Sequence, residues 1–220
     1  MYWIQQPEQT ISLADLQNSM LGTTRVRTLT QTVKLINYGD SIEHIHENWM
    51  LNTAPVSVHD IEELSYILDR GIKAPKHITM SHRALTQLLN YLQTLEDEPI
   101  IAASIAYSQW CILTEYYYPQ PMAFLLAYIF LYKGGISLRN TLSLEQELVS
   151  SPREYAHAIE AIKQTNSSTE WILIFCSSLV RYISKLRRSI ESGDIPVKND
   201  EISRITPRQH EILRLLDGLA

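Results

Sequence analysis

The sequence predicts an all-α fold of about six to eight helices around a buried central helix pair. Two apolar segments, residues 99–113 and 122–132, are separated by a short loop rich in Tyr and Pro. Elsewhere, apolar residues recur at spacings of three and four, which is typical of helices with one buried face. A helix that is apolar on nearly all sides belongs in a core or a membrane. The second segment has only about eleven apolar residues where a membrane span needs roughly 20, so we expect a core.

The helices expected before the central pair follow from apolar stripes and capping residues. Residues 11–22 form a short amphipathic pattern, and residues 28–46 form a longer one. The segment from Ser57 to Gly71 has Asp60 at the position that completes a capping box, and its Gly is a helix stop. Ser81 is expected to cap a helix that runs to about Leu95.

The central pair and the helices after it have similar end signals. Pro119 and Pro121 break the chain between the two apolar segments, and the Gly134-Gly135 pair ends the second one. The segments 151–154 and 167–170 each read as a capping box that opens a helix, the second of them running over residues 171–190.

A polar linker and a short helical tail are expected at the end of the chain. Residues 191–205 are rich in polar residues, Gly and Pro. Thr206, Pro207 and Gln209 form a strong helix start. The apolar stripe of this tail consists of Ile205, Ile212, Leu213, Leu215 and Leu216. A helix of this length is marginal in water, so we expect it to pack on this chain or on a neighbour.

Composition and charge are those of an ordinary globular protein. Hydrophobic residues make up 45% and charged residues 20% of the 220 residues. The net charge of −5 gives no general attraction to nucleic acid. The N-terminus lacks the basic and apolar regions of a signal peptide, and Cys111 and Cys176 lie in apolar helical stretches, where we expect buried thiols and no disulfide. We therefore expect a cytoplasmic protein with no membrane partner.

The order PIIAASIAYSQW, an aromatic loop and FLLAYIFLYKGG resembles the central helix pair of the Fic (filamentation induced by cyclic AMP, or Fido) domain family. Active members of that family carry HxFxDGNGRxxR between these helices. There the His deprotonates a target hydroxyl, the acidic residue holds a metal, and the Gly-Asn-Gly-Arg turn cradles nucleotide phosphates. The resemblance extends to Asn37-Tyr38 and to the closing helices, and it implies a Fic-like domain over residues 1–190.

The diagnostic motif is absent from this chain. Anchored on the first helix, the family His falls on Thr114 and the Phe on Tyr116; anchored on the second helix, the His falls on Leu113 and the final Arg on Phe124. Neither register supplies a His, an acid, a Gly, an Asn or an Arg where the motif needs it. The loop also has no Gly and no cation, and its prolines lack N–H groups, so it cannot cradle a phosphate. We expect no catalytic residue, no cofactor and no metal.

The same resemblance implies three further losses. Gly22 stands where the family's inhibitory helix carries its Glu. Residues 72–79 occupy the place of the family's β-hairpin flap and are too short for one. Residues 206–220 resemble the first helix of an appended winged helix-turn-helix, and we expect neither a recognition helix nor a wing after them.

Three side-chain groups have competing interpretations. His44, His46 and His59, with Glu47, could suggest a metal site, but their spacing favours exposed histidines on helices. The basic cluster Arg181, Lys185, Arg187 and Arg188 is explained by the dipole at a helix C-terminus more simply than by a phosphate partner. The run Tyr116-Tyr117-Tyr118 is either a structural plug or a protein-binding edge.

These observations favour a catalytically inactive, Fic-like module that contacts a protein partner or associates with itself. The first alternative is a protein adenylyltransferase that uses ATP and Mg²⁺ with altered site chemistry. The second is a DNA-associated regulator, which rests on residues 206–216 alone. In the favoured interpretation Tyr116 and Phe124 turn inward, because leaving both rings in water would forfeit several kcal/mol at about 25 cal/mol per Å². Tyr117 or Tyr118 would then face a partner.

Overall fold

The structure is a computed structural model that describes residues 29–72, 80–115, 120–136 and 144–192. The described residues form eight α-helices and contain no strand, which confirms the predicted all-α fold. The helices are α2 (Leu29–Trp49), α3 (Val58–Asp69), α4 (His82–Gln93), α5 (Pro99–Leu113), α6 (Pro121–Lys133), α7 (Leu144–Leu148), α8 (Pro152–Thr165) and α9 (Thr169–Glu191).

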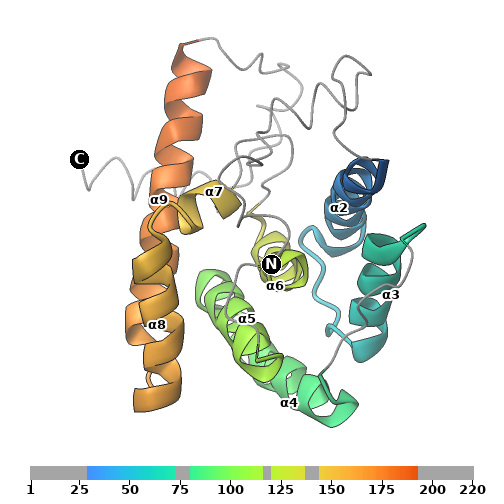
Figure 1. Ribbon diagram of the computed structural model, residues 1–220, viewed down its shortest axis with the longest axis horizontal. Coiled ribbons are helices and arrows are strands. Elements are labelled where there is room, and N and C mark those ends of the chain that lie inside the picture. Colours follow the sequence, from blue (N-terminus) through green and yellow to red (C-terminus); the bar gives the residue numbers. More distant parts are fainter. Residues whose placement is uncertain (1–28, 73–79, 116–119, 137–143, 193–220) are drawn as a thin grey trace.

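The predicted central pair corresponds to α5 and α6, the latter beginning one residue earlier than expected. Figure 1 shows α6 in the middle of the molecule, with α2 and α3 on one side and α8 and α9 on the other. Every side chain from Met122 to Tyr132 is buried. Since α6 has no polar face, it can be stable only when it is enclosed by other helices.

The two central helices run antiparallel and meet at both ends. At one end, a Cβ added to Gly134 would lie 2.3 Å from the Cβ of Pro99, so only glycine fits there. Gly135, with φ of 80°, then reverses the chain, and the Ile136 N–H donates to the Leu131 carbonyl over 2.8 Å. This is a Schellman motif, and it confirms the predicted stop.

The outer helices present one apolar face each to this pair. On α4, Leu85, Leu88, Leu89 and Leu92 are buried, as the pattern predicts. Ser57 and Asp60 form the expected capping box of α3, and the Ser81 hydroxyl accepts from the Ala84 N–H. The core face of α9 consists of Trp171, Phe175, Ser178, Leu179 and Tyr182.

Two predicted capping boxes are wrong in detail. Ser151 precedes α8 with φ −120° and ψ 78°, outside the extended conformation of most N-caps, and its hydroxyl makes no capping hydrogen bond. Helix α9 begins at Thr169, one residue later than a cap at Ser167 requires, and the carboxylate of Glu170 pairs instead with His157. Helix α7 was not predicted at all.

Several sequence-based predictions fall outside the described residues. These are the helix at 11–22, the segment 73–79 that follows Ile72, the linker beyond Ser192 and the tail at 206–220, so the domain boundaries stay predictions. In the part of the chain that the structure describes, none of the helices has the length and apolar character that crossing a membrane requires.

Candidate functional site

The candidate site is the joint between α5 and α6, where the Fic motif would lie. Leu113 is the last residue of α5 and is 39% exposed. Thr114 caps that helix in αR geometry, and Gln120 precedes α6 with extended backbone. Glu115 is exposed and has a positive φ of 53°, so the chain turns sharply away from α5 at this residue.

A hydrogen-bonded tie closes the base of this joint. The indole N–H of Trp110 donates to Gln120 Oε1 over 3.3 Å, and Gln120 Nε2 donates to the Thr114 hydroxyl over 3.1 Å. That hydroxyl in turn donates to the carbonyl of Trp110 over 2.8 Å. The Thr114 hydroxyl therefore uses both its proton and a lone pair in hydrogen bonds. Thr114 is one of the two positions on which the family His falls.

Phe124, on which the final Arg of the motif falls, is buried with 3% exposure. Its ring packs edge-on against Tyr107 with centroids 4.8 Å apart, and Tyr107 stacks on Trp171 at 5.1 Å. The predicted inward position of Phe124 is confirmed. Tyr116, Tyr117 and Tyr118 lie outside the described residues, so the inward ring at 116 and the outward ring at 117 or 118 stay predictions.

The ionisable groups behind the joint are held in their neutral forms. Burial raises the pKa of the Cys111 thiol to about 12, and burial also raises the pKa of the Tyr107 and Tyr155 hydroxyls. The two Tyr hydroxyl oxygens are 3.0 Å apart, and Cys111 Sγ lies 3.8 Å from that of Tyr155. Groups that lose their protons only at such high pH cannot act as bases near neutrality.

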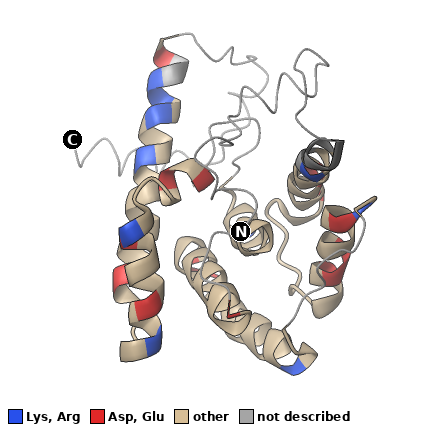
Figure 2. Cartoon of the chain, viewed as in Figure 1, with Lys and Arg blue, Asp and Glu red and all other residues tan. Residues whose placement is uncertain are grey.

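The joint also lacks positive charge. From Ser108 to Tyr128 the sequence contains no Lys, Arg or His. Figure 2 shows α5 and α6 almost wholly without charged residues. Residues 108–128 therefore offer no cationic side chain to the phosphates of a nucleoside triphosphate, and phosphates left uncompensated are costly in an apolar surrounding.

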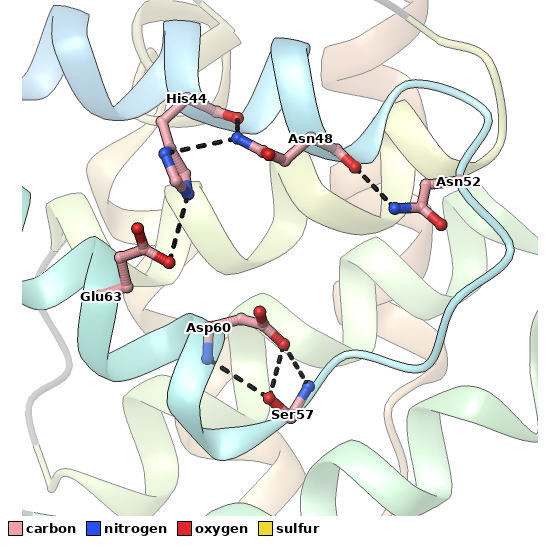
Figure 3. A network of polar contacts seen from close by, with 6 residues as sticks. All are labelled: His44, Asn48, Asn52, Ser57, Asp60 and Glu63. Carbon is pink, nitrogen blue, oxygen red and sulfur yellow. Dashed lines mark hydrogen bonds and ion pairs between the residues drawn. The ribbon is translucent and has the colours of Figure 1, made fainter.

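His44 on α2 belongs to ordinary polar contacts, drawn in Figure 3. His44 Nε2 lies 3.8 Å from Glu63 Oε2, and Asn48 Nδ2 donates to the His44 carbonyl over 2.8 Å. His44 and His46 are half-buried, which corrects the expectation of exposed rings, whereas His59 and Glu47 are exposed. Among the described residues, no three His, Cys, Asp or Glu side chains gather in a way that could hold a metal.

The basic cluster at the end of α9 has a different explanation from the predicted helix dipole. Lys185 Nζ lies 2.5 Å from Glu147 Oε1 on α7, and Arg181 Nε lies 3.7 Å from Glu147 Oε2. The Glu147 side chain is only 8% exposed, so these two cations compensate a buried carboxylate. Arg187 pairs with Glu191 over 2.8 Å. Arg188 donates to the Ser184 carbonyl of its own helix, and Arg181 donates to the Glu147 carbonyl of α7 over 3.2 Å.

Sequence reasoning missed the role of α7. Besides Glu147, this helix places Glu145 where it accepts a hydrogen bond from the hydroxyl of Tyr38 on α2. Burial and the nearby Glu145 carboxylate raise the pKa of Tyr38 and of Tyr128. The sequence signal for this helix was a pair of acidic residues between Leu144 and Leu148. Five residues are too few to show a helical period reliably.

No protein-family model matches this sequence, and no curated protein matches it. The fold and the joint define the chain as an all-α protein whose central helix pair is closed by a neutral, hydrogen-bonded joint. Its resemblance to Fic domains rests on the residues quoted above.

Proposed function

We propose that this chain is a Fic-like cytoplasmic protein without nucleotidyl-transfer activity that works through contacts with a protein partner or with itself. The observation that carries the proposal is the burial of Phe124, which stands at the position where the motif of an active site has an Arg that would contact phosphate. The engaged hydroxyl of Thr114 and the neutral groups around Cys111 support it, because neither can activate a target hydroxyl.

Calorimetric titration of the full chain with Mg²⁺-ATP tests the enzyme alternative first. We expect no binding heat and no transfer of AMP to the chain or to added proteins. Micromolar binding that Phe124→Ala weakens would contradict the proposal and would favour an adenylyltransferase with altered site chemistry.

A second experiment tests the contact itself. A photoreactive phenylalanine analogue at position 117 of the sequence should form a discrete crosslink to a protein in an extract of the source cells or to a second copy. The matched control places the same analogue at position 91, where Tyr91 is 52% exposed on α4. Equal crosslinking from both positions would contradict a binding edge at the joint.

A further inference from the structure

One side of α9 carries apolar side chains that the described elements cover only in part, since Ile172 and Ile183 also pack against the core whereas Leu173 and Val180 are exposed. We call it the α9 stripe. It consists of Ile172, Leu173, Cys176, Val180 and Ile183, which lie on one side of the helix at spacings of three and four. Leu173 is 63% and Val180 is 43% exposed, while the other three are half-buried. Large apolar side chains gathered in this way on a surface usually mark a contact.

The remaining sides of α9 have their partners. The Trp171 indole N–H donates to the Ser104 carbonyl on α5 over 2.7 Å. Glu170 lies 3.0 Å from His157 on α8, and Arg181 and Lys185 reach Glu147 on α7. Figure 1 shows α9 at the edge of the molecule, and its fully buried side chains, which include Trp171, Phe175 and Tyr182, are a different set from the α9 stripe.

We infer that residues 205–216 of this same chain dock on the α9 stripe as an antiparallel helix. Their apolar residues share one helical face, and a helix start signal stands at Thr206. Twelve residues are too few for a stable helix in water without a surface to cover. The α9 stripe and this segment each have an apolar face that needs a cover, and each can cover the other.

The matching lengths of the two helical faces and the short connection between them favour residues 205–216 as the segment that covers the α9 stripe. The α9 stripe spans eleven residue steps, about 17 Å, and a helix over 207–216, which follows the cap at Thr206, is about 15 Å long. Residues 192–204 can span up to about 40 Å, and from the end of α9 the chain must return only about 12 Å to reach Ile183. A tethered segment has an effective concentration in the millimolar range, which favours it over a second copy. The other amphipathic segment, 11–22, leads into α2 on the far side of α6.

Cys176 provides a reporter inside the α9 stripe. Both thiols are free, and Cys111 is buried in the core. The alkylation rate of the folded full chain therefore measures how accessible the Cys176 thiol is. The test variant is L213Q/L216Q, and the matched control is E211Q/R214Q, which makes two similar changes on the polar face of the segment. We expect alkylation of Cys176 to be roughly tenfold faster in the test variant and unchanged in the control.

A second measurement does not depend on weakening the segment. In the variant L213C, mild oxidation at low protein concentration should form an intramolecular disulfide with Cys176, whereas R214C should not. An unchanged alkylation rate in L213Q/L216Q together with no disulfide in L213C would overturn the inference. So would a wild-type chain that sediments as a dimer and whose Cys176 becomes exposed on dilution, since a second copy would then cover the α9 stripe.

Discussion

At the scale of single residues, the amide of Gln120 holds the joint together. In Gln120→Ala, the buried Trp110 indole N–H loses its acceptor and Thr114 loses a donor. We expect the free energy of unfolding to fall by about 1–3 kcal/mol, measured by urea denaturation. Gln87→Ala, an exposed change on α4, should stay within about 0.5 kcal/mol of wild type. Equal effects of the two substitutions would show that the tie contributes nothing.

The ring of Phe124 offers a second test at this scale. Phe124→Ala should cost about 3–5 kcal/mol, because it leaves a cavity beside Tyr107 that a closed core refills poorly. Phe124→Leu should cost clearly less, because it keeps most of the volume. The exposed Tyr91→Ala is the control. A loss below about 1 kcal/mol for Phe124→Ala would mean that the position is open, as a ligand site would require.

At the scale of elements, α7 joins α9 to α2 through its two acids. We expect Glu147→Ala to lower the free energy of unfolding by about 1–3 kcal/mol, less than for a wholly buried pair, because Arg181 and Lys185 are about half exposed and regain water. The effect should persist in 1 M salt, since a buried carboxylate is screened little. Glu160→Ala on α8, where the acid is exposed, should cost less and lose its effect in salt. Salt that abolishes the Glu147 effect would contradict the buried pairing.

Which elements could be predicted depends on whether their signals are local. The bounds of α5 follow from an apolar run and a Pro at its first position, and α3 and α4 follow from hydroxyl caps with extended backbone. Ser151 has the right neighbours but the wrong backbone angles, which sequence does not display. The pair of Tyr38 and Glu145 is 107 residues apart, so no local pattern could predict it. At the joint, the missing motif could be predicted, but the tie through Gln120 could not, because it depends on how two helices end together.

At the scale of the whole molecule, the buried thiol and tyrosine hydroxyls that stay protonated predict that the protein unfolds at alkaline pH. Burial raises the pKa of Cys111 from 9.0 to about 12, so above pH 9 the unfolded chain releases a proton that the folded chain keeps. The folded state then binds more protons, and stability must fall as pH rises from about 9 to 12. The raised pKa of Tyr38, Tyr107 and Tyr128 should steepen the fall above pH 10.

Urea midpoints at unit steps between pH 7 and 11 measure this dependence. Cys111→Ala should flatten the curve between pH 9 and 10, where the unfolded tyrosines are still mostly protonated. The same slope in both proteins would contradict a buried neutral thiol at this position.

The cluster around Trp171 also determines how the folded protein emits light. Tyr107 stacks on this indole at 5.1 Å, and Tyr155 and Phe175 lie within 6.2 Å of it. At such separations an excited tyrosine passes its energy to tryptophan before it can fluoresce, so Tyr107 and Tyr155 should contribute almost no emission of their own in the folded chain. Loss of the packing would restore tyrosine emission, and the cluster can therefore report, without any label, on whether α5 and α9 are still in contact.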